Sequence, residues 1–439
     1  RNTKAKIPRS PLKNDKKDDM LSESMFVFIF KEGSAFMSKI IFHIDVNSAY
    51  LSWTAVNLLK KGEPTDLRTI PSAIGGSTES RHGIILAKST PAKKYGIVTG
   101  EPIVSALRKC PQLVVYPPDF SLYSTYSHAM FRLLCEYSDR VEPFSVDEGF
   151  LDYTGMEPLL GPPLETAKAL QNRIKQELGF TVNIGISTNK LLAKMAGELE
   201  KPDKCITLFP EEIEKKLWPL PVEELFMVGR RTAPRLRKMG IHTIGDLAAY
   251  PPPLLEKAFK SYGAMLHAYA NGIDDSPVAP ANAVSESKSI GNSTTTPFDV
   301  TDCETAHKIL LALAETVAMR LRQEKLCAAE IAVTLKTSAF QVYSHQKRLT
   351  NAIDCTNAVY AAATEIFNEV WKGEPLRLLG IRAGKLCKED CLQLSFLEQD
   401  WSKQKKADAA MDAIRMKYGK NSIRRSAFLD KAENPFQKH

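Results

Sequence analysis

Two adjacent carboxylates, Asp147 and Glu148, stand out in the stretch FSVDEGFLDYTG, residues 144–155. The apolar and aromatic residues on both sides predict a buried hairpin around them. Buried carboxylates repel one another and are costly to desolvate, unless one holds a proton or a cation lies between them. Hard divalent cations such as Mg²⁺ prefer oxygen ligands and keep waters for a substrate phosphate. The pair therefore raises the hypothesis of a metal site.

A third carboxylate, Asp45, ends the apolar run IIFHIDV, residues 40–46, which predicts a buried strand. Three carboxylates at neighbouring strand ends can hold two cations about 4 Å apart, the arrangement used for in-line phosphoryl chemistry. From these residues alone, acids in solvated turns are the favoured interpretation, because adjacent Asp-Glu pairs are common.

Length and composition limit the classes of protein. A chain of 439 residues is too long for one core and predicts two to four domains. The formal charge of +8 fits a polyanionic partner such as nucleic acid, and equally a soluble protein that happens to be basic. The eight dispersed cysteines contain no CxxC pair, which argues against a zinc ribbon and suits a reducing cytoplasm. No apolar run approaches the ~18 residues of a membrane helix.

The pattern of predicted elements changes along the chain. Strands and helices alternate over residues 38–205, which indicates one α/β unit. Short helices follow from residue 210, and a Gly/Pro/Asp/Ser-rich stretch at 271–287 predicts a linker. Residues 288–386 predict the order βαββαβ. The basic C-terminal region predicts one helix near 403–420 and a loosely ordered remainder.

Five segments, in this order and spacing, resemble Y-family DNA polymerases, the translesion type of the DinB/UmuC group. They are HIDVNSAYLSW, PIVSALRKCPQLVVYPPDF, EPFSVDEGFLDYTG, NIGISTNKLLAKMAGELEKPDK and LPVEELFMVGRRTAPRLRKMGIHTIGDL. The similarity runs from about Lys39 to about Phe428. It implies template-directed addition of dNTPs to a primer 3′ end, with low fidelity, past damaged bases and without proofreading, in DNA repair and the SOS response. It also implies two Mg²⁺ ions, which Mn²⁺ can replace, and a monomer in the cytoplasm that binds primer–template DNA.

The resemblance implies an α+β multidomain fold with a right-hand architecture. Residues 1–36 are set apart as a tag or flexible tail. The N-terminal parts are an α/β palm (38–50 and 117–206), small fingers (51–116) and an all-α thumb with a helix-hairpin-helix (207–275). A linker (276–287), a βαββαβ little finger (288–390) and a tail (391–439) follow.

Residue by residue, Asp45, Asp147 and Glu148 match the family's metal-binding triad, and the carbonyl of Val46 matches the main-chain ligand. Tyr50 matches the steric gate, whose ring excludes a ribose 2′-hydroxyl. An aromatic residue that simply packs at a helix start fits the same position.

Three further residues are expected at the nucleotide. Lys190 matches a lysine that contacts the triphosphate. Thr90 and Lys93 stand where the family usually has a Tyr and an Arg that clasp the phosphates. Since Lys lacks the bidentate fork of Arg, we expect a weaker or rearranged grip. Leu86 lies in the stretch that covers the nascent base pair, where several relatives carry a smaller residue.

Contacts to DNA outside the active site are expected from the thumb and the little finger. The hairpin at Gly229, Arg230 and Arg231 resembles a helix-hairpin-helix, whose free backbone N–H groups hold a phosphate. Arg235 and Arg237 add charge to this segment. Lys288 is expected to contact the template backbone.

Asn292 stands where the family often has an Arg, and Lys288, Lys347 or Arg348 are candidates to compensate for the lost charge. In the tail, QLSFL at 393–397 resembles the sliding β-clamp-binding peptide, with Gln393, Leu394, Phe396 and Leu397 as its anchors.

Other classes of protein share parts of this pattern. A degenerate polymerase that only recruits partners would not need the intact triad and Tyr50. A palm-fold nucleotidyl cyclase has no obvious use for a helix-hairpin-helix and a βαββαβ domain. A two-metal nuclease would degrade a primer without dNTPs.

Overall fold

The computed structural model describes residues 39–76, 83–283, 287–388, 402–419 and 421–428. The chain divides into two compact units, residues 1–56 with 120–282 and residues 57–119 with 283–439. Residues 1–36, expected to be a tag or tail, and the peptide 393–397 lie outside the described residues.

The first unit is built on a five-stranded sheet in the order β5-β6-β1-β7-β8. The central strand β1 (Ile41–Val46) lies antiparallel to β6 (Glu148–Asp152) and β7 (Val182–Ser187). Strand β5 (Val141–Pro143) forms a hairpin with β6, as predicted, and β8 (Cys205–Thr207) lies parallel to β7 at the edge.

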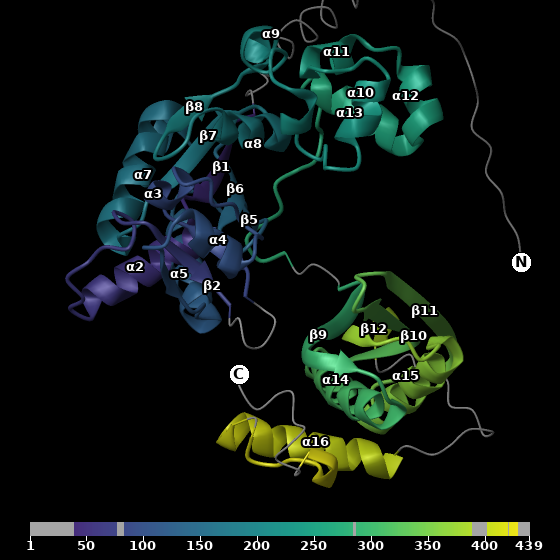
Figure 1. Ribbon diagram of the computed structural model, residues 1–439. Coiled ribbons are helices and arrows are strands. Elements are labelled where there is room, and N and C mark those ends of the chain that lie inside the picture. Colours follow the sequence, from purple (N-terminus) through teal and green to yellow (C-terminus); the bar gives the residue numbers. More distant parts are fainter. Residues whose placement is uncertain (1–38, 77–82, 284–286, 389–401, 420, 429–439) are drawn as a thin grey trace, which may run out of the picture. The chain divides into compact units, whose positions relative to one another are not determined.

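Alternation along β1 sends its side chains to two different faces. Phe42, Ile44 and Val46 join a hydrophobic core shared with helices α2 (Ala49–Lys60), α5 (Phe120–Leu134) and α7 (Pro163–Leu178). The side chains of His43 and Asp45 therefore point to the opposite face, which α8 (Lys190–Leu199) covers through its contacts with β1 and β7. Figure 1 shows these elements in one compact body. The short helix α6 (Glu157–Leu160) forms a single turn before α7.

The rest of this unit is all-helical, as the sequence predicts. Its elements are η1 (Pro210–Glu212), α9 (Ile213–Lys216), η2 (Val222–Glu224), α10 (Ala233–Lys238), α11 (Ile244–Ala249), α12 (Pro252–Phe259) and α13 (Ser261–Ala270). Leu236, Leu247 and Leu266 lie at the centre of their core, which Leu192 and Met195 of α8 also join. Helix α8 thus packs against both the sheet and the helical module.

In the second unit, residues 57–119 form a small three-stranded sheet in the order β3-β2-β4. Its strands are β2 (Ser72–Gly75), β3 (Ile85–Lys88) and β4 (Val114–Tyr116), with the short helices α3 (Thr90–Lys93) and α4 (Ile103–Lys109). This mixture of short strands and helices fits the alternation predicted over residues 38–205.

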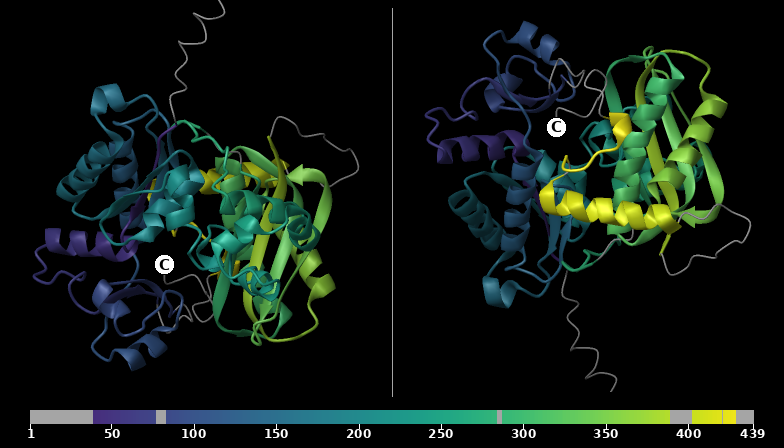
Figure 2. Two further views of the ribbon diagram at one scale, coloured as in Figure 1. Left: turned by 90° about the horizontal axis from the view of Figure 1, so that it is seen from above. Right: turned by 90° about the horizontal axis from the view of Figure 1, so that it is seen from below.

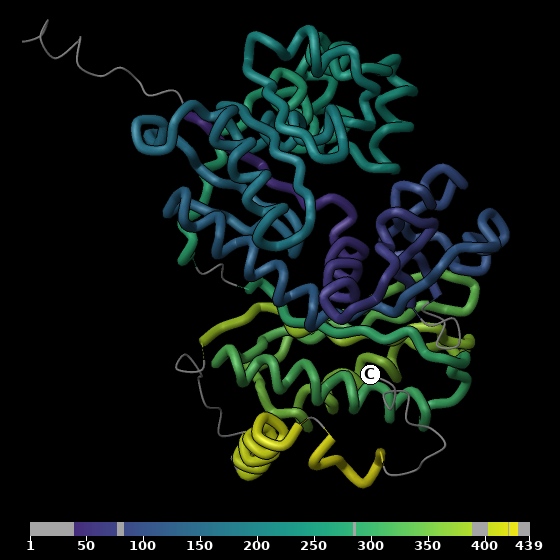
Figure 3. Tube along the Cα trace, turned by 90° about the vertical axis from the view of Figure 1, so that its left-hand side faces the viewer, coloured from purple at the N-terminus to yellow at the C-terminus, as the bar shows by residue number. Residues whose placement is uncertain are grey.

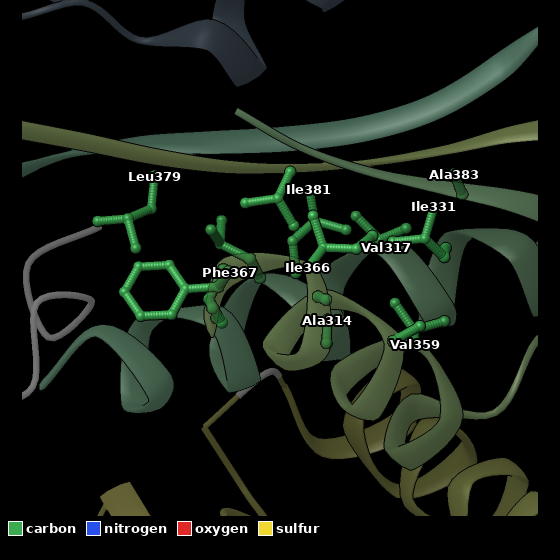
Figure 4. Close-up of a cluster of buried hydrophobic side chains, with 14 of the residues drawn as sticks. Ala314, Val317, Ile331, Val359, Ile366, Phe367, Leu379, Ile381 and Ala383 are labelled. Atoms are coloured by element: carbon green, nitrogen blue, oxygen red, sulfur yellow. The ribbon is translucent and has the colours of Figure 1, made fainter. Parts of the chain in front are cut away.

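Residues 289–388 form the predicted βαββαβ fold. Strands β9 (Ser289–Val300), β10 (Leu326–Thr337), β11 (Val342–Ile353) and β12 (Leu376–Lys388) pair in the order β11-β10-β12-β9. Helices α14 (Cys303–Gln323) and α15 (Thr356–Val370) cover one face of this antiparallel sheet, as both views in Figure 2 show. Figure 4 shows the core between the layers, where Phe367 and Ile366 of α15 meet Leu379 and Ile381 of β12.

A last helix, α16 (Ser402–Tyr418), lies against α14 and α15 on the side away from the sheet (Figure 3). The predicted helix is therefore confirmed. The prediction that the rest of the C-terminal region is loosely ordered is only partly correct, because residues 421–428 contain the 3₁₀ turn η4 (Ser426–Phe428). Arg425 fixes this segment through bonds to Glu315 and Asn357, both of 2.8 Å.

Candidate active site

Asp45 and Glu148 lie directly opposite each other on the antiparallel strands β1 and β6. Side chains that face each other in this way project from the same side of the sheet, with Cβ atoms about 4.5–5.5 Å apart. The main chain continues the pairing past the strand end, because Val46 N–H donates to the Asp147 carbonyl at 3.0 Å. Two of the three predicted acids are therefore neighbours, and the third begins one residue away.

Ser145 shapes the turn that carries Asp147. Its hydroxyl accepts hydrogen bonds from the N–H groups of Asp147 and Glu148, both at 3.2 Å, and donates to Asp147 Oδ1 at 2.5 Å. The main chain closes the turn where Phe144 N–H and Ser145 N–H donate to the Glu148 carbonyl. The Asp147 side chain is half-buried at the end of this turn.

The protein itself supplies the cations that make these acids tolerable. Lys201 Nζ lies 2.6 Å from Asp45 Oδ2, and Lys194 pairs with Glu148 Oε2. The same Glu148 oxygen lies 3.0 Å from Nε2 of the buried His43. Burial opposes ionisation of Glu148, but the bonds from His43 and Lys194 prevail and lower its pKa to about 2. Burial raises the pKa of Asp45, although Lys201 acts against that shift.

These residues fit a divalent metal in their chemistry. Asp45 and Glu148 offer hard oxygen donors side by side, and each is neutralised by an ammonium group that a metal ion can replace. Among the described residues no three His, Cys, Asp or Glu side chains converge as a ready metal cluster. The Asp147 carboxylate accepts from the Ser145 hydroxyl.

Tyr50, the second residue of α2, is held in an aromatic stack. Its ring lies 4.4 Å from the ring of Tyr123 with an interplanar angle of 10°, and Phe120 meets its edge at 6.1 Å. Burial and, next, the charge of Asp147 raise the pKa of Tyr50. The ring is thus rigid and close to Asp147, which suits the predicted gate.

Lys190 lies beside the acids without touching them. Its ammonium pairs with Glu142 at 2.8 Å and lies 5.0 Å from the centre of the Phe150 ring. Lys194 and Lys201 hold the two carboxylates instead. Sequence reasoning missed both lysines and His43. A signal existed for two of them, because Lys194 lies one helical turn after Lys190 and His43 shares the face of Asp45.

Thr90 and Lys93 lie in the other unit, on the short helix α3, and both are exposed. Ser89 caps this helix by accepting from Ala92 N–H at 3.1 Å. Leu86 is partly buried in β3. Their predicted roles at the nucleotide stay predictions.

The hairpin of the helical module exposes two of its arginines and uses the other two internally. Arg230 and Arg231 are exposed beside Gly229, whose carbonyl accepts from Thr232 N–H at 2.9 Å. Arg235 instead donates to the Ala258 carbonyl at 2.7 Å, and Arg237 pairs with Glu223. Within the described residues, the side chains of Arg230 and Arg231 therefore make no comparable hydrogen bond or ion pair with the helical module.

The expected contacts of the βαββαβ fold lie on its sheet. Lys288 is exposed just before β9, and Asn292 lines a small pocket of about 430 Å³ with Arg382. Lys347 pairs with Glu365, whereas Arg348 is exposed.

Comparison with known proteins assigns the family. The impB/mucB/samB family matches residues 44–198, its C-terminal domain matches 287–396, and the thumb domain of DNA polymerase iota matches 223–274. DNA polymerase IV of Clostridium acetobutylicum is 50% identical over 402 residues, which cover 90% of this chain and 100% of the relative. The chain belongs to the DinB-like Y-family of DNA polymerases.

Other relatives of this Y-family polymerase agree. DNA polymerase IV 1 of Bacillus subtilis is 37% identical over 90% of this chain and 95% of its own length. A Y-family DNA polymerase chimera shares the fold with a TM-score of 0.67 at 22% identity, over 80% of this chain and 99% of its own.

The chain is therefore a translesion DNA-directed DNA polymerase with an α+β multidomain fold. The family's dependence on divalent metal ions and its substrates, DNA and nucleotides, follow from this membership. Among the described residues, none of the helices has the length and apolar character needed to cross a bilayer.

Proposed function

We propose that Asp45, Asp147 and Glu148, with the carbonyl of Val46, hold two Mg²⁺ ions that serve nucleotide transfer at this site. The observation that carries the proposal is the register of the sheet, which sets Asp45 opposite Glu148. Magnesium bound there would polarise the α-phosphate and lower the barrier to attack by the primer 3′-hydroxyl.

The other residues of the site have distinct tasks. Tyr50, fixed against Tyr123, excludes a ribose 2′-hydroxyl. Lys201 and Lys194 pair with the carboxylates, and a metal bound there would leave their ammonium groups available to neutralise phosphate oxygens. Lys190 remains the contact that the family resemblance favours.

The experiment is primer extension by the wild type beside Asp147→Ala over a range of Mg²⁺ concentrations. Asp152→Asn is a matched control, because Asp152 lies opposite Ile41 at the far end of β6, the strand that follows Asp147. We expect extension to be lost with Asp147→Ala and kept with the control. Extension by Asp147→Ala at the wild-type rate would remove Asp147 from the metal site.

The phosphate grip is proposed to include Thr90 and Lys93, whose exposed side chains leave their polar ends available. Lys93→Ala should weaken dNTP binding in a titration with a dideoxy-terminated primer. An unchanged affinity would show that Lys93 lies outside the site.

Binding of DNA is proposed for Gly229, Arg230, Arg231 and Lys288, through sequence-independent and salt-sensitive phosphate contacts. The double variant Arg230→Gln/Arg231→Gln should bind duplex DNA more weakly and with a shallower dependence on salt. Arg237→Gln is the comparison, since Arg237 is already paired with Glu223.

We also propose that the polymerase works as a monomer in the cytoplasm and docks on a sliding β-clamp through Gln393, Leu394, Phe396 and Leu397. An extended peptide with two apolar anchors is suited to a clamp pocket. Deleting 393–397 should abolish clamp-stimulated synthesis and spare basal synthesis. Equal loss of both would count against clamp docking.

A further inference from the structure

A buried histidine lies directly behind one of the proposed metal ligands. His43 is 0% exposed at the middle of the central strand β1, and its Nε2 lies 3.0 Å from Glu148 Oε2. Its ring packs against Phe150 with centroids 4.9 Å apart. The translesion chemistry described above gives this histidine no task.

The contacts of His43 fix where its proton lies. Glu148 Oε2 also accepts from the ammonium group of Lys194, so this oxygen is an acceptor and the hydrogen of its bond to His43 lies on Nε2. Nδ1 is buried and has no hydrogen-bond partner in the described residues. A second proton there would leave a buried N–H group unpaired, which is costly. The neutral tautomer with its hydrogen on Nε2 satisfies both ends of the ring.

The surrounding backbone holds the ring in this position. A Cβ atom at Gly197 of α8 would lie 3.4 Å from His43 Nδ1, which is van der Waals contact, so the backbone of α8 lies directly against this edge of the ring. At Gly185, the β7 partner of His43, a Cβ would lie 1.9 Å from the Ala193 carbonyl oxygen. Strand and helix therefore enclose the imidazole from two sides.

Glu148 is consequently anchored through one oxygen only. Oε2 receives both His43 and Lys194, whereas no hydrogen bond to Oε1 is present in the described part of the chain. Groups that hold the far side of a ligand fix its orientation, and their loss typically costs about 10–100-fold in metal affinity or activity.

We propose that His43 is a positioning residue, which donates from Nε2 to Glu148 Oε2 and so presents Oε1 of Glu148 to the metal. This inference rests on the proposed metal site. His43 does not touch the metal or the nucleotide; it acts through Glu148.

The test uses two substitutions of equal length, His43→Gln and His43→Met, in the full chain. Gln keeps an N–H donor at the ε position, and Met fills similar space without one. Mn²⁺ binding is measured by electron paramagnetic resonance with a dideoxy-terminated primer–template and dNTP, so no chemistry occurs. The Mg²⁺ concentration for half-maximal extension and the dNTP KM are measured in parallel.

We expect His43→Met to weaken Mn²⁺ binding about 10–100-fold and to raise the half-maximal Mg²⁺ concentration, with little change in dNTP KM at saturating metal. His43→Gln should restore most of the affinity. Equal Mn²⁺ binding by His43→Met and wild type would overturn the proposal, as would a His43→Gln variant no better than His43→Met.

Glu148→Gln separates this inference from the proposed function beneath it. If Glu148→Gln binds Mn²⁺ like the wild type, the metal site itself is wrong. If Glu148→Gln loses Mn²⁺ while His43→Met keeps it, only the role of His43 fails. Thermal unfolding of each variant shows whether it is folded. If His43→Met does not fold, weakened Mn²⁺ binding by His43→Gln alone would overturn the proposal.

Discussion

Two regions of the molecule pair carboxylates with cations in partly buried places, but with different cations. The first is the five-stranded sheet with α8 and Lys201, which we call the palm. The second is α16 with residues 421–428, which we call the C-terminal clasp. In the palm, Lys194 and Lys201 each bond a single oxygen of Glu148 and Asp45. In the clasp, arginine joins the acids of α16 to the βαββαβ fold.

The clasp is the more fully bonded of the two. Arg322 of α14 donates to Asp412 at 2.8 Å, to the Asp354 carbonyl at 2.8 Å and to Asp408 at 3.3 Å. Asp408 also accepts from Thr356 N–H at 2.7 Å and from Arg425 at 3.4 Å. The side of α16 that faces the fold is therefore charged rather than apolar.

This difference in the paired cation helps to distinguish a binding site from a purely structural contact. A guanidinium fork makes several oriented bonds at once and fixes its partners. An ammonium group is a mobile point charge that a metal ion can displace. Lysine-neutralised acids at a strand end therefore indicate a binding site, whereas arginine-locked acids between helices indicate architecture.

The largest effect that would sharpen this comparison is expected from Asp45→Asn. Losing a metal ligand should reduce kcat/KM of primer extension by about 10³-fold or more, roughly 4 kcal/mol of transition-state stabilisation. The free energy of unfolding in urea should change by less than about 1 kcal/mol, because the paired Lys201 is a third exposed. A variant that extends primers normally but unfolds easily would place Asp45 with the structural acids.

Arg322→Met should show the opposite division. It leaves Asp408 and Asp412 buried without their main cation, which should cost about 3 kcal/mol of unfolding free energy. Extension per folded molecule should stay unchanged. Lys308→Met is the matched control on the same helix, because its partner Glu304 is 81% exposed, and it should cost no more than about 0.5 kcal/mol. Equal losses in the two variants would mean that the clasp is only a surface contact.

Gly185→Ala tests whether the palm acids depend on the close approach of α8 to β7. The new methyl group would meet the Ala193 carbonyl, so α8 must shift, at a cost of about 1–3 kcal/mol. Because α8 carries Lys194, extension should fall as well. Gly373→Ala, which meets no atom within 4 Å, controls for the loss of a glycine, although its φ of +90° adds strain of its own. Full stability in Gly185→Ala would contradict the tight packing described here.

Much of this fold is readable from periodicity. The apolar run IIFHIDV predicts β1, and α7 fits the alternation of strands and helices predicted over residues 38–205. The order βαββαβ is also confirmed. Strand β2 and the edge strand β8 were missed, because each has only three or four residues and depends on its neighbour in the sheet rather than on its own pattern.

The site was harder to predict than the fold. Asp45 and Glu148 are far apart in the sequence. The resemblance to a family assigned them to one site, and the pairing of β1 with β6 places them opposite each other. The resemblance selected Lys190, yet the ammonium groups on the acids belong to Lys194 and Lys201. Lys190 and Lys194 lie one turn apart on α8 and Lys201 follows the end of that helix, so spacing alone cannot say which of them reaches which carboxylate. His43 and Asp45 are two residues apart on one strand, so their side chains lie on the same face of the sheet. This spacing could have predicted that His43 lies near the acids.

The smallest effect expected is from Lys201→Met, and it decides between the two lysine assignments. Removing a third-exposed ammonium group should change the unfolding free energy by no more than about 1 kcal/mol. If Lys201 moves from Asp45 to the triphosphate when metal binds, the dNTP KM should rise about tenfold, since a charge-assisted hydrogen bond is worth about 1.5–3 kcal/mol. Lys190→Met is the matched variant, and its ammonium group already has a partner in Glu142. A larger rise in KM for Lys190→Met than for Lys201→Met would support the assignment made from the sequence, and would show that Lys201 only neutralises Asp45 until metal arrives.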